Sequence, residues 1–395
     1  MVLDLVLAVG CVPVAAASSY LFGLTVLSAR PRPPLCAQPR TRFTVVVPAH
    51  DERTNIAATV ESLLRTDYPE GLRAVLVVAD NCSDDTADIA RAAGASVLER
   101  TDAEKRGKGY ALAAGFERIM GEGSSDAIVV VDADSRVSPN LLRACAARLE
   151  DGAPAVQVEH GVANPEASWR TRLMAIAFSL FHAVRSVGRE RLGLSCGLRG
   201  NGMAFAVRTL HEVPYAAYSL AEDVEYGVRL GQAGHRVWYA GEAQVRSEMV
   251  TSEKAARSQR RRWEEGRRGL AGGFGLSLLG EGLRRRSLVL VDLAIDLLVP
   301  PLSFVFIAAC VGTAVAVGAW STGHVGPAVA VAWAACLAMI CVYVARGVLL
   351  SGAGARGFVD LAAAPAYIAW KLALRLRRRN DGAWVRTSRE GDRSR

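Results

Sequence analysis

The chain has 395 residues, of which 51% are hydrophobic, and a formal net charge of +8. This length leaves room for one large or two medium soluble domains together with membrane-embedded segments. The basic residues gather beside long apolar blocks, where they would meet anionic lipid headgroups, so a nucleic-acid-binding protein is not expected. The eight cysteines show no paired C-x-x-C spacing, and the sequence therefore indicates neither a disulfide framework nor a zinc site.

Residues 1–28 are predicted to form an N-terminal transmembrane helix. The stretch is almost wholly apolar, carries the single charge of Asp4, and is long enough to span a bilayer. A cleaved signal peptide would place its positive charge before a shorter apolar run, so an uncleaved anchor is favoured. By the positive-inside rule, the arginines that follow predict a cytoplasmic main body. These arginines are Arg30, Arg32, Arg40 and Arg42.

Residues 41–286 are predicted to form this cytoplasmic body, an α/β domain. Short apolar runs rich in β-branched residues alternate here with segments of helical periodicity, which favours a mostly parallel sheet covered by helices on both faces. Ligands bind such sheets at the carboxyl ends of their strands. The expected strands are 43–47, 74–79, 96–98, 128–131 and 203–207, and the expected helices are 55–64, 86–93, 110–120 and 222–230.

Polar residues follow three of these strands, so acidic groups are expected to converge on one crevice. Ala49 to Glu52 follow the first strand, Asp80 ends the second, and Asp132 and Asp134 follow the strand at 128–131. Two carboxylates one residue apart at a strand end suit Mg²⁺ or Mn²⁺, which binds through carboxylates and substrate phosphates. The alternative is a pair of solvated aspartates that open a turn.

A lysine between glycines and an acidic helix start are two further candidates. Lys108 lies between Gly107 and Gly109, where a cation can approach a phosphate closely; a solvated charged loop is the alternative. Glu222 and Asp223 open a helix. They either stabilise the helix dipole or hold a carboxylate toward the crevice, as a general base requires.

The last candidate set precedes the membrane segments. On a helix, Gln259, Arg262 and Trp263 fall on one face, which then offers an amide, a guanidinium and an indole. This combination suits stacking on a sugar or nucleobase and pairing with a diphosphate. A basic juxtamembrane helix with a tryptophan at the interface is the alternative.

Residues 287–374 are predicted to form membrane-associated helices. Asp292 and Asp296 lie on one face of a helix at 287–298, interpreted as interfacial, which ends before Pro300-Pro301. Transmembrane helices are expected at 299–320 and 325–350, and the loop between them lacks Lys and Arg, which predicts an external loop. The remaining expectations are an amphipathic interfacial helix at 357–374 and a basic disordered tail at 375–395.

Six motifs in this order resemble the membrane-bound family 2 glycosyltransferases, which include the cellulose, chitin, hyaluronan and poly-N-acetylglucosamine synthases. The resemblance covers about residues 41–286. It implies the nucleotide-diphosphate-sugar transferase fold called GT-A and direct transfer with inversion at the anomeric carbon. The motifs are Val47-Pro-Ala-His-Asp-Glu52, Asp80-Asn-Cys-Ser-Asp-Asp-Thr86, Arg106-Gly-Lys-Gly109, Asp132-Ala-Asp134, Glu222-Asp223 and Gln259-x-x-Arg-Trp263.

The resemblance also implies a role for each candidate residue. A divalent Mg²⁺ or Mn²⁺ would stabilise the departing diphosphate while a carboxylate takes the acceptor proton. The expected nucleotide-sugar-binding residues are Ala49, His50, Glu52, Asp80, Lys108, Asp132 and Asp134, with Asp134 as the metal ligand, Asp223 as the catalytic base, and Glu222, Gln259, Arg262 and Trp263 beside the acceptor and diphosphate.

The function expected from the sequence is sugar transfer from a nucleotide-diphosphate-sugar, with a UDP-sugar as the expected donor, to a membrane-associated glycan or lipid acceptor. The enzyme would be a multi-pass protein of the cell (inner or plasma) membrane that acts at the cytoplasmic face. Two spans after the catalytic body are few for an export channel, so a processive polysaccharide synthase would need a partner subunit or a homo-oligomer. A non-catalytic membrane subunit that binds nucleotide-sugar, or a nucleotidyl transferase, would also fit parts of this pattern.

Overall fold

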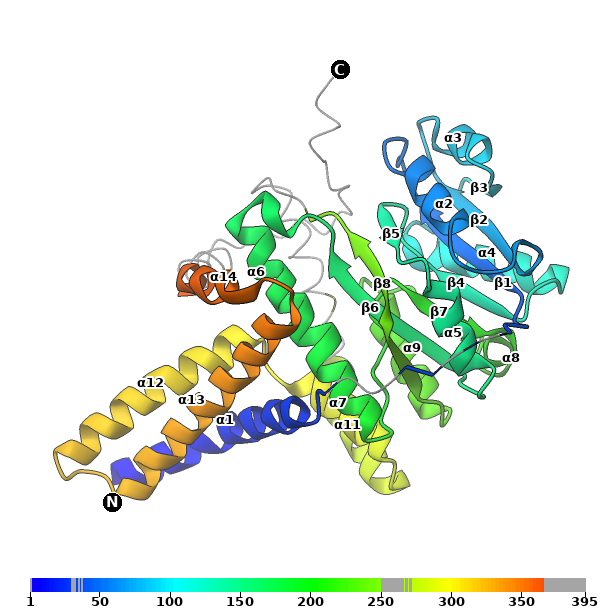
Figure 1. Cartoon of the computed structure of the whole chain (residues 1–395). Coiled ribbons are helices and arrows are strands. Elements are labelled where there is room, and N and C mark those ends of the chain that lie inside the picture. Colours follow the sequence, from blue (N-terminus) through cyan, green and yellow to red (C-terminus); the bar gives the residue numbers. More distant parts are fainter. Residues whose placement is uncertain are drawn as a thin grey trace.

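The computed structural model of the chain describes residues 2–29, 33, 34, 36, 38–249, 266, 269 and 272–365. Within this part, an α/β body lies on one side and a group of apolar helices on the other (Figure 1). A long helical segment, coloured green in Figure 1, runs between the two.

The body is built on one eight-stranded sheet with the strand order β3-β2-β1-β4-β7-β6-β8-β5. The four strands from β3 to β4 are parallel, as predicted, and so are β6 and β8; the pairs β4–β7, β7–β6 and β8–β5 are antiparallel, which makes the sheet mixed. The strands are β1 (Phe43–Ala49), β2 (Arg73–Asp80), β3 (Ser96–Arg100), β4 (Ala127–Val130), β5 (Ser135–Val137), β6 (Ala155–Val162), β7 (Met203–Ala206) and β8 (Val237–Ser247).

Helices cover both faces of the sheet because the central strands are apolar on both sides. In β1, Val45 and Val47 pack with α2, α3 and α5, while Val46 faces the opposite side and packs with α4 and α9. The described helices of the body are α2 (Ile56–Leu64), α3 (Thr86–Ala92), α4 (Lys108–Glu122), α5 (Leu141–Leu149), α8 (Val207–Glu212) and α9 (Glu222–Gln232), with short 3₁₀ turns at Glu70–Leu72 and Pro165–Ala167.

The segment between β6 and β7 forms a long interrupted helix that the sequence analysis does not predict. It consists of α6 (Trp169–Phe178), a π-helical segment η3 (Ser179–Val184) and α7 (Arg185–Arg191). A capping box at Ser168 and Thr171 begins it. The segment packs against α1 through α7 and against α13 through η3, and so joins the body to the apolar helices.

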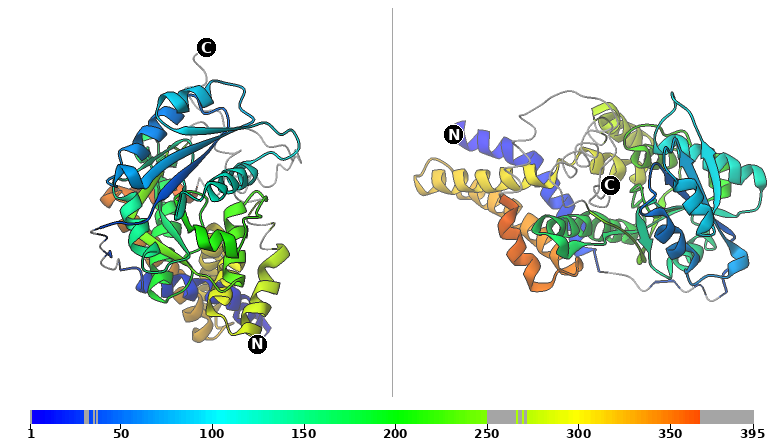
Figure 2. Two further views of the ribbon diagram at one scale, coloured as in Figure 1. Left: turned by 90° about the vertical axis from the view of Figure 1, so that its right-hand side faces the viewer. Right: turned by 90° about the horizontal axis from the view of Figure 1, so that it is seen from above.

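Among the described residues, three helices are long and apolar enough to cross a membrane: α1 (Val2–Val26), α12 (Leu302–Ser321) and α13 (Pro327–Leu350). Their positions agree with the three transmembrane helices that the sequence predicts. They pack on one another, with α1 against α13 and α12 against α13. The right-hand view of Figure 2 shows α1 and α12 extending away from the body. A further helix covers residues 272–285.

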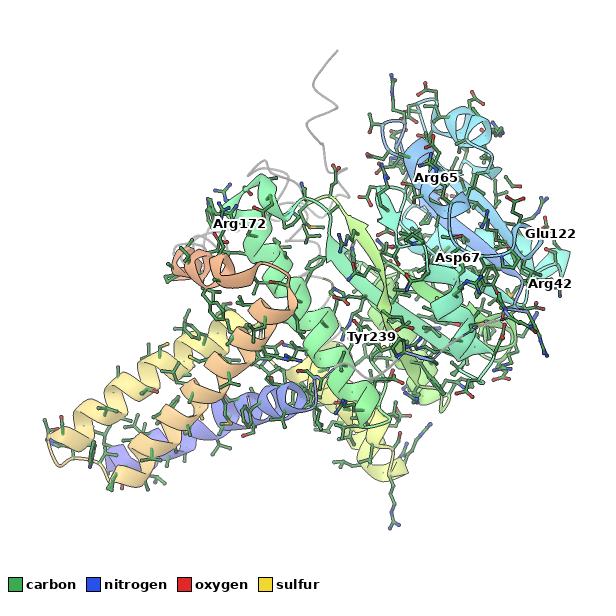
Figure 3. All side chains as sticks on the ribbon, viewed as in Figure 1. Arg42, Arg65, Asp67, Glu122, Arg172 and Tyr239 are labelled. Carbon is green, nitrogen blue, oxygen red and sulfur yellow. The ribbon has the colours of Figure 1, made fainter. Side chains whose placement is uncertain are left out.

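The predicted helix at 287–298 is α11 (Leu288–Leu298), which is capped by Ser287 and ends before Pro300. Its acidic face is buried in the protein, because Asp292 and Asp296 contact α7. The segment expected at 357–374 is described only in part, as α14 (Gly354–Asp360) and a 3₁₀ turn at Leu361–Ala363. Arg172 of α6, labelled in Figure 3, binds Asp360 at 2.7 Å and ties α14 to α6. The tail at 375–395 lies outside the described residues.

Candidate active site

The loops after β1 and β2 lie against each other at the carboxyl end of the sheet. The ring Nδ1 of His50 lies 2.8 Å from the carbonyl oxygen of Asp80, and the side-chain hydroxyl of Thr86 accepts a hydrogen bond from the amide of Glu52. Asp51 and Asn81 both adopt positive φ, at 53° and 52°, so the chain turns sharply where each strand ends. The structure thus brings the predicted residues His50, Glu52 and Asp80 together; Ala49 is buried at the end of β1.

Asp80 is held by a buried ion pair. Its carboxylate accepts a hydrogen bond from the Arg100 guanidinium at 2.6 Å, and the same guanidinium reaches Asp102 at 2.9 Å. Arg100 also lies over the ring of Tyr110, with the guanidinium carbon 5.9 Å from the ring centroid. These contacts fix the end of β2 against α4, on the side where Lys108 begins that helix.

A second acidic group lies in the same loops. Ligand atoms of Asp51, Cys82 and Asp84 lie within 4.8 Å of one another. The Asp51 carboxylate accepts hydrogen bonds from the amide and hydroxyl of Ser83, and the Asp84 carboxylate accepts them from the amide and hydroxyl of Thr86. These bonds stabilise the loop conformation, as short acidic side chains commonly do in turns.

Lys108 lies at the centre of the candidate site, in the first turn of α4. Its ammonium group is 2.5 Å from Asp132 Oδ1 and 3.8 Å from Glu222 Oε1, and it donates a hydrogen bond to the Gly200 carbonyl. Burial opposes the charge on this lysine, but the carboxylates of Asp132 and Glu222 outweigh that effect and raise its pKa above the ordinary value. Lys108 therefore carries a positive charge where β4, α4 and α9 meet.

Gly109 allows α4 to approach the loop before α9. A Cβ atom at this position would lie 2.3 Å from the carbonyl oxygen of Ala217, which no side chain tolerates. Beside this contact, the rings of Tyr110 and Tyr218 stack with centroids 4.4 Å apart. The glycine after Lys108 therefore serves helix packing in addition to any approach of a phosphate.

The turn at Arg199–Gly202, here called the 199–202 turn, links three of the predicted site residues. Gly200 and Gly202 have φ values of 78° and 69°, which glycine adopts without strain. The Gly200 carbonyl binds Lys108, and a Cβ atom built on Gly200 would lie 3.3 Å from Asp223 Oδ2. The turn therefore fills the space between the lysine and the acidic start of α9.

Asn201 connects this turn to the end of β4. The residue is 1% exposed, its side-chain oxygen accepts a hydrogen bond from the Asp132 amide at 3.1 Å, and its side-chain nitrogen donates to Ser135 Oγ at 2.8 Å. Asn201 thus binds the backbone of Asp132 and the side chain of Ser135, on either side of Asp134. Neither Gly200 nor Asn201 is among the site residues predicted from the sequence; the Gly-Asn-Gly pattern immediately before a strand is the signal that could have identified them.

The carboxylates of Glu222 and Asp223 open α9 and face the lysine and the 199–202 turn. The Glu222 side chain is only 12% exposed. Burial raises the pKa of Glu222 to about 7, against the opposing effect of Lys108 and with a further contribution from Asp223. Burial also raises the pKa of Asp223. This pair can therefore accept a proton near neutral pH, which is the property that a general base needs.

The turn after β4 offers the oxygen donors that Mg²⁺ and Mn²⁺ prefer. Asp132 engages Lys108, while the Asp134 carboxylate accepts a hydrogen bond from the Ser135 hydroxyl at 3.2 Å. Such ions are held by one or two carboxylates together with substrate phosphates. The carboxylates at this turn therefore fit a divalent metal, and the role of Asp134 as its ligand stays a prediction.

The predicted residues Gln259, Arg262 and Trp263 lie outside the described residues. Gly266, three positions after Trp263, is described. A Cβ atom on Gly266 would lie 3.1 Å from Ala221 Cβ and from the backbone of Leu220, immediately before α9.

The family of the chain follows from comparison with known proteins. The sequence profile described as "Glycosyltransferase like family 2" matches residues 39–266, which is more than half of the chain. The chain therefore belongs to this family of glycosyltransferases. The family 2 resemblance and the GT-A-type α/β fold predicted from the sequence are confirmed.

Individual relatives share part of the sequence. "Probable glycosyltransferase YdaM" of Bacillus subtilis is 26% identical over 57% of this chain and 55% of its own length. "Beta-monoglucosyldiacylglycerol synthase" of Synechocystis is 28% identical over 58% of this chain and 48% of its own length. The chain thus spans about half the length of these curated relatives.

A solved structure resembles most of the chain. The mannosyltransferase PcManGT of Pyrobaculum calidifontis, solved in complex with GDP-Man and Mn²⁺, superposes with a TM-score of 0.57 at 18% identity. The match covers 87% of this chain and 97% of that protein. At this identity the likeness is one of fold.

Proposed function

We propose that the protein is an inverting glycosyltransferase that moves a sugar from a nucleotide-diphosphate-sugar, expected to be a UDP-sugar, to a lipid acceptor at a membrane surface. Family membership supports the reaction class. The name of the Synechocystis relative, a monoglucosyldiacylglycerol synthase, supports a lipid acceptor of the diacylglycerol type. The three helices long and apolar enough to cross a membrane support an acceptor that stays in the bilayer.

The observation that carries the proposal is the meeting of Lys108, Asp132 and the Glu222–Asp223 pair around the 199–202 turn. In the proposed reaction, Asp223 takes the proton from the acceptor hydroxyl as that oxygen attacks the anomeric carbon. The raised pKa of this carboxylate makes it a stronger base than an exposed aspartate. Lys108 places a positive charge beside the predicted diphosphate position, and Asn201 keeps the Asp132–Asp134 turn in place.

A divalent ion held by Asp134 would supply charge stabilisation for the departing nucleotide diphosphate. The relative of known structure was solved with Mn²⁺, which supports this choice of ion. Two further roles are proposed for predicted residues. His50, Glu52 and Asp80 would contact the base and ribose of the nucleotide. The segment with Gln259, Arg262 and Trp263 would lie beside the acceptor.

The helix that carries the proposed base packs directly on a helix that leads to the apolar segment. Ala221, Val224 and Val228, at the start and along one side of α9, pack with Leu290 and Leu293 of α11. Because α11 leads into α12, an acceptor whose tails lie among lipids could present its hydroxyl to Asp223 without leaving the membrane.

For orientation, we propose that the catalytic body and the chain end after α13 lie in the cytoplasm. The loop 322–326 between α12 and α13 carries no Lys or Arg, whereas Arg346 at the other end of α13 binds the Ser28 hydroxyl at 2.8 Å. A His324→Cys variant in a background without accessible cysteines should react with a membrane-impermeant maleimide added to intact cells. Reaction only after the cells are opened would reverse the orientation.

The reaction itself is tested with purified protein in lipid vesicles that contain diacylglycerol. A panel of labelled UDP- and GDP-sugars is added in the presence of Mn²⁺, and the lipids are analysed by mass spectrometry. We expect one or a few sugars attached to the lipid from one donor, and no such product in vesicles without diacylglycerol. Long polymer in place of glycolipid would favour the processive alternative, and the absence of any product from every donor would contradict the proposal.

A further inference from the structure

A buried cluster of five charged residues joins α7, α11 and the 199–202 turn; we call it the arginine cluster. Its side chains are between 0% and 9% exposed. It consists of Arg185, Arg189, Arg199, Asp292 and Asp296. A buried ion pair of this kind is expensive to break from one side, because the remaining charge is then left without compensation.

Asp296 is the central carboxylate of the cluster. It lies 3.0 Å from Arg185 Nη1, 2.9 Å from Arg189 Nη2 and 3.6 Å from Arg199 Nη1. Asp292, one turn earlier on the same face of α11, binds Arg189 at 2.9 Å. The two aspartates share a helix, a burial state and a partner, but the ion pair to Arg199 is made by Asp296.

The cluster is also tied to two of the apolar helices. Tyr20 of α1 donates a hydrogen bond to Asp292 at 2.8 Å and accepts one from Arg189 at 2.6 Å. Tyr343 of α13 accepts a hydrogen bond from Arg185 at 2.9 Å. The positions of α1, α11 and α13 therefore constrain the side chains of Arg185 and Arg189.

Arg199 carries this arrangement into the proposed active site. Its backbone amide donates to Gln157 Oε1 at 2.8 Å, and its guanidinium carbon lies 4.1 Å from the centroid of Phe181 in η3. The next residue is Gly200, which binds Lys108 through its carbonyl and lies against the Asp223 carboxylate. A shift of Arg199 would therefore move the backbone that separates Lys108 from Asp223.

We infer that Asp296 is a positioning residue that acts through Arg199 and holds the 199–202 turn in its place between Lys108 and Asp223. The packing of the apolar helices thereby completes a site whose reacting groups all come from the glycosyltransferase domain. The alternative is that the cluster only fastens α11 to α7. Loss of the ion pair between Asp296 and Arg199 would then leave the 199–202 turn unchanged, and this difference can be measured. The turnover part of the test rests on the proposed function.

The experiment compares Asp296→Asn with Asp292→Asn, each purified as the full chain in lipid vesicles. Displacement of a reacting group by a distant substitution can lower turnover by about 10²-fold, so we expect Asp296→Asn to lower kcat at least about tenfold with the KM for the donor nearly unchanged. Asp292→Asn should keep kcat within about threefold of wild type, because it leaves the ion pair between Asp296 and Arg199 intact. Asp296→Glu should recover part of the lost turnover.

Hydrogen–deuterium exchange gives a readout that does not depend on activity. In Asp296→Asn, amides of the 199–202 turn should exchange faster than in wild type, and in Asp292→Asn they should not. Arg199→Gln provides a second test if Asp296→Asn does not fold. In this variant Asp296 keeps Arg185 and Arg189 as partners, so the rest of the arginine cluster stays paired. Arg199→Gln should loosen the same turn and lower kcat. Equal effects of the two aspartate variants, or unchanged exchange in both Asp296→Asn and Arg199→Gln, would overturn the inference.

If wild type shows no sugar transfer, the proposed function fails, and the exchange data alone then decide whether Asp296 positions the turn.

Discussion

The acidic pair at the start of α9 and the acidic pair on α11 lie in opposite charge surroundings. At the start of α9, the carboxylates of Glu222 and Asp223 lie near the ammonium group of Lys108, which also pairs with Asp132. Among the described residues, three carboxylates therefore act on this one ammonium group. On α11, Asp292 and Asp296 face three guanidinium groups.

This difference explains why the same residue types can do different work. A carboxylate pair with too little positive charge around it holds protons more tightly and favours an additional cation. A pair surrounded by arginines stays ion-paired and fastens the elements that carry it. We therefore assign proton transfer and metal-assisted chemistry to the α9 side, and the placement of the domain on the apolar helices to α11.

The largest effect on turnover in this comparison is expected when the proposed divalent metal ion is lost. Asp134→Ala removes the proposed metal ligand, and because a metal supplies several kcal/mol of transition-state stabilisation, turnover should fall by about 10²-fold or more. Sugar transfer is measured with and without a strong chelator. Asp84→Asn is the matched control, since this carboxylate binds Thr86 within its own loop and should leave metal dependence intact. Full activity of Asp134→Ala, or of chelated wild type, would remove the metal from the mechanism.

On the α11 side, the expected effect is on stability. Asp292→Asn leaves three buried guanidinium groups with Asp296 as their one carboxylate in the cluster. Breaking a buried ion pair from one side typically costs about 3–5 kcal/mol, so the melting temperature in detergent should drop by many degrees. Turnover per folded molecule should stay near that of wild type. A melting temperature close to wild type would mean that the arginine cluster does not hold α11 in place.

The pH dependence of turnover tests the raised pKa values of the two carboxylates at the start of α9. A base acts only when deprotonated, and the pKa of Glu222 is raised to about 7 while that of Asp223 is raised by the same burial. Because Asp223 is the proposed base and its pKa is raised, turnover should begin to fall at a higher pH than it would with an exposed carboxylate, which would give a flat profile down to about pH 5. Lys108→Met removes a charge that lowers the pKa of Glu222, so the acid limb should move to higher pH. A flat profile in wild type would refute the raised pKa values.

The smallest effect is expected for an ion pair on the exposed surface. Glu61 and Arg65 of α2 lie four residues apart, 2.8 Å from each other, with side chains 50% and 76% exposed. Glu61→Gln should change the free energy of unfolding by no more than about 0.5 kcal/mol, because water and salt already screen such pairs. A loss comparable to that of Asp292→Asn would show that burial is not what separates the two cases.

Much of the fold can be predicted because the first strands are short apolar runs with polar residues at their ends. The apolar run from Val45 to Val47 predicts a strand buried on both faces. Asp80 and Asp132 stand at the carboxyl ends of strands, where α/β sheets commonly bind ligands. The antiparallel part of the sheet is harder to predict from the sequence. No strand is predicted at β5, β6 or β8, and these strands pair with partners far away in the sequence: β6 pairs with β8 across 82 positions at Ala155 and Val237, and β5 pairs with β8 across 112 positions at Ser135 and Ser247.

The α6–α7 segment and the arginine cluster escape prediction for a related reason. Arg185 and Arg189 have the appearance of surface residues until their partners on α11 are known, and Arg185 meets Asp296 across 111 positions of sequence. The same holds for Asn201, whose bond to the Asp132 amide spans 69 positions. Motif residues at strand and helix ends are visible in a sequence, whereas residues that only position them become visible through their contacts.

The most direct test of the account is the effect of Asp223→Asn on sugar transfer in vesicles. This change keeps the shape of the side chain and removes its ability to take a proton. General-base catalysis contributes about 10²- to 10⁴-fold, so turnover should fall by that factor while the nucleotide-sugar still binds with wild-type affinity. Glu225→Gln is the matched control on the same helical turn, because Glu225 pairs with Arg229, and it should keep near-normal turnover. Near-normal turnover in Asp223→Asn, or loss of donor binding instead of turnover, would contradict the account.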